Sequence, residues 1–359
     1  MRKKGIIGLS LALLLFIQVL CFLQLLVTPK YMEESRDGAM IGEYYDQAGY
    51  QDLIFLGDCE VYENFSPVVL WEEYGISSWI RGSAQQTIWQ SCCLMEETFR
   101  YETPRVMVFN VLSMKYSTPQ STADPLRREA YNRMTLDTMR WSSCKWRCIR
   151  ASMTEQERQQ GAMWTYLFPI LRYHERWSQL TQEDIRYLFH RDPVTDNGYL
   201  MQTGVAPFTQ PHEEPPPVEE DFGEESWAYL DRMRLLCEEN GTRLVLIKAP
   251  SLYPRWWDCW DERIRDYARR YELPYYNLLE AQEAIGLDWS ADTYDTGLHL
   301  NVWGAEKLSR YFGRLLQQDL ALPDRRDDPA LSAVWEEKLR IYDRRKSGDA
   351  VPVRKENPN

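Results

Sequence analysis

Two short segments of the sequence contain residue types that could together perform nucleophilic catalysis. The first, Phe55-Leu-Gly-Asp-Cys-Glu-Val-Tyr62, places Cys59 just after an apolar run that ends in glycine. The second, Asp292-Thr-Tyr-Asp-Thr-Gly-Leu-His-Leu-Asn301, contains His299 and several acidic residues. A thiol is a competent nucleophile when a nearby imidazole accepts its proton, and a carboxylate can orient that imidazole. The two segments therefore predict a Cys–His site.

The acidic residues around this pair leave its third member and its reactivity open. Asp295 lies four residues before His299, and Asp292 is the alternative acid. Asp58 and Glu60 flank the cysteine, and negative neighbours raise the pKa of a thiol. Three alternatives remain: a working cysteine enzyme, a slow one, or an inactive fold.

A series of apolar runs is expected to form the strands that position these segments. Expected strands cover residues 52–57, 75–80, 104–112, 243–247 and 274–278, and expected helices cover 85–100, 227–240, 256–271 and 305–320. This alternation predicts parallel βαβ units. Ligands of such sheets usually bind at the carboxyl ends of the strands, where Cys59 follows the first expected strand.

The remaining segments suggest how the chain is divided. Residues 115–200 are rich in Arg, Trp, Met and Tyr, and we expect a helical insertion there; a loop rich in Pro and Glu follows and ends near residue 225. The expected units are a membrane anchor at 1–27, a polar juxtamembrane segment at 28–50, an α/β domain at 51–322 and a charged tail at 323–359. The insertion, 115–225, lies inside the α/β domain.

The first 27 residues predict a single membrane span. Arg2, Lys3 and Lys4 precede an uncharged stretch, residues 5–27, whose length as a helix is roughly that of the hydrocarbon layer. The basic flank would stay in the cytoplasm, so the rest of the chain would be extracytoplasmic. A cleaved signal peptide is the alternative. We favour an uncleaved anchor because no small-residue cleavage motif follows the apolar stretch.

These motifs resemble those of the SGNH (GDSL-like) hydrolase and acyltransferase family, over roughly residues 50–112 and 226–320. In that family a G-D-S or G-S-S turn after the first strand presents the nucleophile, and a D-x-x-H loop precedes the last helix. Here Cys59 stands in place of the serine, and Asp295 lies one residue further from His299 than in the family pattern. The resemblance implies a three-layer α/β/α fold with a parallel, flavodoxin-like sheet.

The resemblance also implies an oxyanion hole. The family uses the N–H of the nucleophile, a glycine after the second strand and an asparagine after the third. Gly82 matches the second position, and Asn110 is nominated for the third, although no G-x-N-D motif is present. Asn110 could equally be a hydrogen-bonded polar residue of the core.

Composition and motifs exclude several other functions. The net charge is -12, and the chain has no long basic run between the N-terminus and the tail, which argues against nucleic-acid binding. The sequence has no Walker loop, dinucleotide fingerprint or H-E-x-x-H motif, so we expect no cofactor. The eight cysteines include no CxxC pair and no His cluster accompanies them, so a metal site is not expected; disulfides and buried thiols both remain possible.

The leading hypothesis is acyl chemistry at the cell surface. The resemblance implies an esterase or O-acyltransferase that acts on acyl or acetyl groups of an envelope glycan, or on a small ester. Cys59 would be the nucleophile, His299 the base and Asp295 its partner. The alternative is a catalytically inactive binding or scaffold module that partners a membrane acyltransferase.

Overall fold

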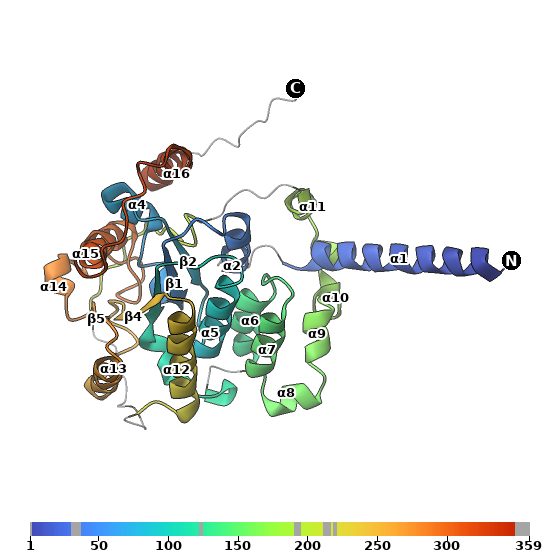
Figure 1. The fold of residues 1–359 in the computed structure, drawn as a ribbon, viewed down its shortest axis with the longest axis horizontal. Helices are drawn as coiled ribbons and strands as arrows, with labels where there is room; N and C mark the ends of the chain where they lie inside the picture. Colours follow the sequence, from blue (N-terminus) through green and yellow to red (C-terminus); the bar gives the residue numbers. More distant parts are fainter. Residues whose placement is uncertain are drawn as a thin grey trace.

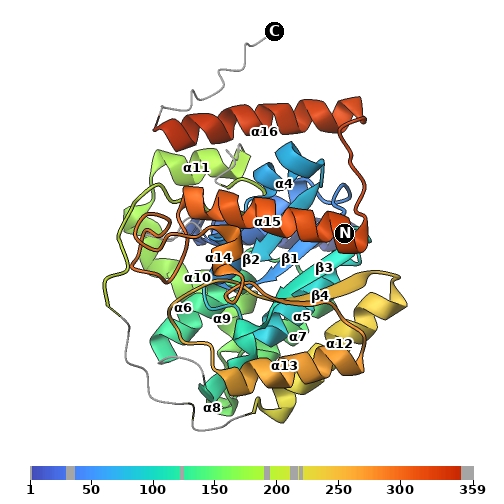
Figure 2. The ribbon, with the colours of Figure 1, turned by 90° about the vertical axis from the view of Figure 1, so that its left-hand side faces the viewer.

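The chain forms a parallel β-sheet of five strands with helices on both faces (Figures 1 and 2). The computed structural model describes residues 2–29, 37–121, 125–189, 195–210, 217 and 221–348. The strands are β1 (Leu53–Gly57), β2 (Ser78–Gly82), β3 (Val106–Asn110), β4 (Arg243–Lys248) and β5 (Tyr275–Asn277). Their order is β2-β1-β3-β4-β5, and every pairing is parallel. This flavodoxin-like order confirms the predicted fold class.

The strands form where the sequence has short apolar runs, and all five predicted strands are confirmed to within a few residues. In β1 every residue is buried, as expected for a central strand covered on both faces. Alternate side chains enter different cores: Ile54 and Leu56 point to one face, Leu53 and Phe55 to the other.

Each face of the sheet has its own set of helices. One core contains side chains of α5 (Ile88–Thr98), α12 (Glu224–Glu239) and α13 (Asp258–Arg270). The other contains side chains of the following elements: α3 (Cys59–Tyr62), α4 (Pro67–Tyr74), α14 (Gln282–Ile285), α15 (Val302–Leu320) and α16 (Pro329–Ser347). The predicted helices correspond to α5, α12, α13 and α15.

The predicted helical insertion is present between β3 and α12. Its elements are η2 (Val111–Lys115), η3 (Pro119–Ser121), α6 (Pro125–Leu136), α7 (Ser143–Ala151), α8 (Glu155–Gln159), α9 (Met163–Leu167), α10 (Ile170–Tyr173), η4 (His174–Gln179) and α11 (Gln182–Phe189). The insertion packs on the rest of the fold at three places: η2 lies against β1, β4 and α12, α6 against α2, and α7 against α5. Part of the loop that follows it, residues 211–216 and 218–220, lies outside the described residues.

The N-terminal helix α1 (Arg2–Val27) projects from the domain on the side of the insertion (Figure 1). Within the described residues, Ile6–Val27 is the one stretch long and apolar enough to cross a membrane. The segment at 28–50, expected to be polar, contains α2 (Asp37–Glu43) and η1 (Tyr44–Asp46). Met40, Ile41 and Tyr44 are fully buried, so this segment contributes to the core of the α/β domain.

The charged region after residue 323 contains α16, which lies along the outer side of α4 and α15 (Figure 2). Trp335 stacks on Trp71 with ring centroids 5.1 Å apart and an angle of 6° between the rings. Residues 349–359 lie outside the described residues.

Candidate active site

Cys59 is the first residue of α3, directly after β1. Asp58 caps this short helix by accepting a hydrogen bond from the Glu60 backbone N–H at 3.2 Å. Gly57 allows the sharp turn because a Cβ there would lie 2.5 Å from Val61. The residue as a whole is half-buried, but its thiol is surrounded closely enough to be desolvated. The strand-to-helix turn therefore presents Cys59 at the carboxyl edge of the sheet.

His299 lies in the loop before α15, and Asp295 holds it at two points. One carboxylate oxygen accepts the His299 backbone N–H at 2.8 Å, and the other lies 2.6 Å from Nδ1. Thr296 and Gly297 between them have positive φ angles of 63° and 98°. This left-handed turn brings residue 295 back to residue 299, which explains how a spacing of four residues can still pair an acid with the imidazole.

Two further residues contact the imidazole and were not predicted from the sequence. Glu63, at the end of α3, has a carboxylate oxygen 3.5 Å from His299 Nδ1. The Tyr294 hydroxyl donates a hydrogen bond to Glu63, and its ring stacks on His299 with centroids 6.1 Å apart. The imidazole is thus placed among two carboxylates and an aromatic ring. Glu63 was not singled out because its helix and the His299 loop are far apart in sequence.

Asn64 fixes the position of the His299 loop relative to the sheet. Its side-chain oxygen accepts the Leu300 backbone N–H at 2.8 Å, and its amide donates to the Pro250 carbonyl at 3.1 Å. Asn64 is fully buried. A single amide therefore joins the chain after α3, the chain after β4 and the residue next to His299. Nothing in the sequence around Asn64 distinguishes it from an ordinary loop asparagine.

The charges around the pair oppose formation of a free thiolate. Burial raises the pKa of Cys59 to about 11; His299 lowers it, and Asp58 and Glu63 raise it. Burial would lower the pKa of His299, but the charge of a Cys59 thiolate, Asp295 and Glu63 keep that pKa well above its ordinary value. His299 Nε2 is buried, and a hydrogen bond between the ring and the Cys59 thiol is among the causes that raise the His299 pKa. Because Asp295 is hydrogen-bonded to Nδ1, Nε2 is the ring nitrogen that can exchange a proton with Cys59.

A buried ion pair between α3 and β4 fixes the turn that carries Cys59. The Lys248 ammonium at the end of β4 lies 2.9 Å from both carboxylate oxygens of Glu60, and both side chains are fully buried. Ser251 also donates to Glu60, and Lys248 donates to the Ala249 carbonyl. Burial and the charge of Glu60 raise the pKa of the neighbouring Asp58 to about 6. Glu60, the residue after Cys59, is thus fixed to the fourth strand.

Gly82 and Asn110, the residues predicted to form the oxyanion hole, lie at the ends of β2 and β3. Gly82 ends β2 opposite Gly57, and a Cβ there would lie 3.3 Å from Tyr62 of α3. Asn110 ends β3, but its amide donates to Asp58 and Glu60 and its oxygen accepts the Ala249 N–H. It therefore links the acidic side chains beside Cys59.

Asp292, the alternative acid, has other partners. Its carboxylate lies 2.6 Å from the Lys307 ammonium of α15 and accepts the Asp288 backbone N–H at 2.7 Å. Its backbone carbonyl accepts the Asn301 N–H. Asp292 therefore joins the loop to the start of α15, whereas Asp295 is the acid hydrogen-bonded to the imidazole. Within the described residues, no group of three His, Cys, Asp or Glu side chains is arranged to hold a metal ion.

Comparison with known proteins adds one structural resemblance. No protein-family model and no curated protein matches the chain. One solved structure that matches is described as a "putative acylhydrolase" from Bacteroides fragilis, with a TM-score of 0.38 and 11% sequence identity. The match covers 77% of this chain and 94% of that one. At this level the resemblance carries no information on substrate or mechanism. The strand order and the site define a flavodoxin-like α/β protein with a cysteine, a histidine and an aspartate at the carboxyl edge of its sheet.

Proposed function

We propose that this protein is an SGNH-type ester hydrolase or O-acyltransferase that uses Cys59 as its nucleophile. The observation that supports this most directly is the state of His299. Asp295 occupies Nδ1, which leaves Nε2 available to Cys59, and the charge and hydrogen bond of Cys59 are among the causes that raise the pKa of the ring. This is the arrangement that a general base next to a nucleophile requires.

In the proposed reaction, the sulfur of Cys59 attacks the carbonyl carbon of an ester while its proton passes to His299 Nε2. The tetrahedral intermediate then breaks its carbon–oxygen bond, and the imidazolium returns the proton to the departing alcohol. The product is a thioester on Cys59. Water or an acceptor hydroxyl attacks this thioester, loses its proton to His299, and releases the thiolate, which recovers that proton. Asp295 stabilises the imidazolium in both halves.

The oxyanion is proposed to be stabilised by backbone donors at the ends of β1 and β2. The Cys59 N–H lies at the strand-to-helix turn, and Gly82 ends the neighbouring strand in register with Gly57. Such donors typically contribute a few kcal/mol to the stabilisation of the transition state. Asn110 would act mainly by holding Asp58 and Glu60, because its amide hydrogens are bonded to them.

The substrate class and location of the proposed enzyme follow from the family resemblance and from α1. With α1 uncleaved in the membrane, the α/β domain would be extracytoplasmic, and acyl or acetyl groups on an envelope glycan would be within its reach. A small soluble ester is the alternative substrate. Neither assignment requires a cofactor or a metal.

One observation favours the alternative function, an inactive binding or scaffold module that partners a membrane acyltransferase. Burial and the nearby carboxylates raise the pKa of Cys59 to about 11. A thiol with this pKa has little thiolate at neutral pH and depends entirely on His299 for activation.

Hydrolysis of an aryl acetate by the purified full-length chain in detergent tests the proposal. We expect Cys59→Ala and His299→Ala to abolish the activity, and Asp295→Asn to lower kcat by about 10²- to 10⁴-fold. Asp292→Asn should retain most of the activity because Asp292 contacts Lys307 and the loop backbone instead of the imidazole.

The matched control is Cys259→Ala, which removes the thiol of another half-buried cysteine, in α13. Cys59→Ser tests whether the site accepts a hydroxyl nucleophile. Activity that survives in Cys59→Ala would contradict the proposed nucleophile. A wild-type chain that is folded and inactive, with the serine variant also inactive, would favour the binding module.

A further inference from the structure

The end of α1 is fixed to the helical insertion. Val27, the last residue of α1, is fully buried, and its carbonyl accepts a hydrogen bond of 2.7 Å from the Arg176 guanidinium. The contacts of α1 are with α10, α11 and η4. Figure 1 shows these elements at the end of the domain from which α1 projects. If α1 spans a bilayer, this part of the insertion lies at the membrane surface.

The same elements, and α9, which packs against α10, carry exposed apolar side chains. Phe189 of α11 is 78% exposed and Trp164 of α9 is 58% exposed; the others are Leu171, Trp177 and Ile185. These five residues, here called the apolar face, come from α9, α10, η4 and α11. Exposed apolar side chains that gather on neighbouring elements are typical of a surface that contacts a partner or a lipid phase. Tryptophan in particular is enriched at the level of the lipid headgroups, where its ring is amphipathic enough to suit both phases.

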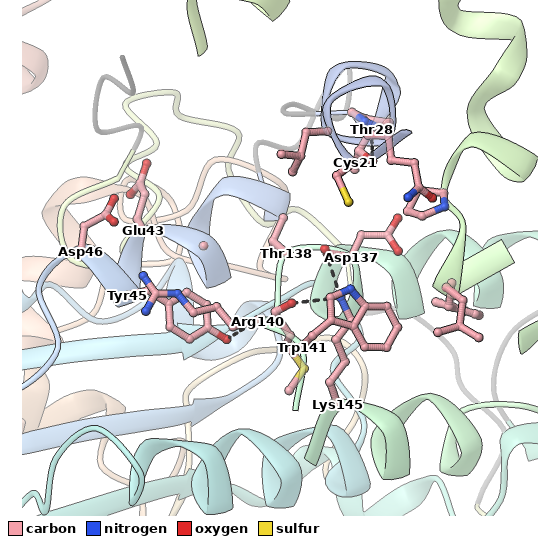
Figure 3. A pocket seen from close by; sticks show the side chains of 18 residues that line it. Cys21, Thr28, Glu43, Tyr45, Asp46, Asp137, Thr138, Arg140, Trp141 and Lys145 are labelled. Carbon is pink, nitrogen blue, oxygen red and sulfur yellow. Dashed lines mark hydrogen bonds between the residues drawn. The ribbon is translucent and has the colours of Figure 1, made fainter. Parts of the chain in front are cut away.

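A cavity of about 620 Å³ lies beside this face, between α1 and the domain. In Figure 3, Cys21 of α1 and Thr28, the residue after α1, lie on one side of it, opposite Tyr45, Arg140 and Trp141. Its lining combines apolar groups such as Leu25 and Leu167 with two cations and three carboxylates: Arg140, Lys145, Glu43, Asp46 and Asp137. The side-chain oxygen of Gln24, also in the lining, is buried without a partner among the described residues. Apolar walls beside charges of both signs suit an amphiphile that has a zwitterionic headgroup.

We propose that the apolar face and this cavity bind membrane phospholipid, so that the insertion lies in the headgroup region of the bilayer. Four of the five residues lie on elements that contact α1, and α9, which carries Trp164, packs against one of these elements, α10. The inference depends on α1 remaining in the membrane, as proposed above, and not on the chemistry of Cys59. The insertion would then act as a second membrane contact, which limits rotation of the α/β domain about the anchor.

Tryptophan fluorescence of the full-length chain in lipid vesicles tests this directly. All 14 tryptophans of the sequence lie outside α1, so quenching by phospholipid brominated on its acyl chains near the glycerol reports contacts of the extramembrane part alone. We expect clear quenching for the wild type, compared with vesicles of the same phospholipid without bromine. In the double variant Trp164→Phe, Trp177→Phe, the quenched fraction should fall by about half or more.

The matched control is Trp303→Phe, which removes a tryptophan that is 40% exposed on α15, away from the insertion. It should leave the quenched fraction unchanged. Phenylalanine keeps an apolar ring at each position, and circular dichroism of each variant checks the fold. Equal quenching in the double variant and the control, or no quenching of the wild type, would overturn the proposal. Failure of the chain to float with vesicles would also overturn it, whereas aryl acetate hydrolysis is a separate readout of the Cys59 site.

Discussion

The reactivity of Cys59 depends on how its immediate neighbours share charge. Asp58 and Glu63 raise the thiol pKa and His299 lowers it, while Asp295 and Glu63 favour the charged imidazole. The carboxylates therefore oppose the thiolate and favour the imidazolium, and the two groups influence each other's protonation.

Alkylation of Cys59 should keep accelerating with pH beyond the range of an ordinary thiol, whose pKa is about 8.5. The reason is that the thiolate reacts, and burial raises the Cys59 pKa to about 11. His299→Ala should slow alkylation at pH 8 severalfold, because it removes the group that lowers this pKa. Iodoacetamide labelling resolved by peptide mass spectrometry measures both effects, with Cys259 as the internal reference. A Cys59 rate that levels off near neutral pH would instead indicate a thiolate–imidazolium pair.

Asp58→Asn should make the protein more stable at pH 8 by about 1–3 kcal/mol, with the gain shrinking towards pH 4. Burial raises the folded pKa of Asp58 to about 6, above the unfolded value of about 3.9. The folded state therefore binds the proton more tightly, and the stability from this group is lost as the pH rises through 6. Asparagine remains a good cap, because one oxygen of Asp58 accepts both the Glu60 N–H and the Asn110 amide.

Urea unfolding of both proteins across this pH range measures the difference. Parallel pH profiles for wild type and Asp58→Asn would contradict the raised pKa.

At the scale of elements, the site depends on how α3 is fixed to β4. Helix α3 has only four residues and could not hold a nucleophile by its own hydrogen bonds. Glu60, at its second position, forms the buried pair with Lys248 at the end of β4. This pair connects residues 188 positions apart and orients the first turn of the helix.

Lys248→Met should destabilise the protein by about 3–5 kcal/mol, because it leaves the Glu60 charge buried and uncompensated. The double variant Glu60→Gln, Lys248→Met should recover part of this loss, since neither side chain then carries a charge. Chemical denaturation followed by fluorescence measures both. The control is Arg269→Met, which breaks an exposed pair with Asp266 and should change little. A double variant less stable than Lys248→Met would show that the buried charge of Glu60 is not the cause of the loss.

At the scale of the whole molecule, the helices just before the first strand and after α15 complete the core. Helix α2 adds Met40 and Ile41, and α16 adds Trp335 and Tyr342. Lys346 and Tyr342 of α16 also contact Glu306 on α15. Both α2, which precedes the first strand in sequence, and α16, which follows α15, therefore contribute to the core. The stability of the α/β domain should depend on them.

Trp335→Ala should lower the free energy of unfolding by about 3–5 kcal/mol, because it removes a fully packed ring from its stack on Trp71. Val334→Ala, one residue earlier on the exposed side of α16, is the control and should shift it by no more than about 0.5 kcal/mol. Thermal or urea unfolding measures the two changes. Similar values for both variants would mean that α16 is not part of the cooperative fold.

The sequence by itself determined the order of the strands and helices along the chain, the apolar N-terminal helix, and the positions of Cys59 and His299 at the ends of their elements. These features depend on local patterns: apolar runs for buried strands, a glycine at a sharp turn, and a basic flank before an apolar stretch. The pairing of His299 with Asp295 was also expected, since both lie in one loop.

Only the tertiary structure decided what surrounds the pair. Glu63, Asn64 and Lys248 reach their partners across long stretches of chain, and no local pattern encodes such a contact. The roles of α2 and α16 have the same origin, because a charged helix joins a core only when another surface is shaped to bury its apolar side. Burial is a property of the assembled fold, and here it sets the charges around Cys59 on which the proposed chemistry depends.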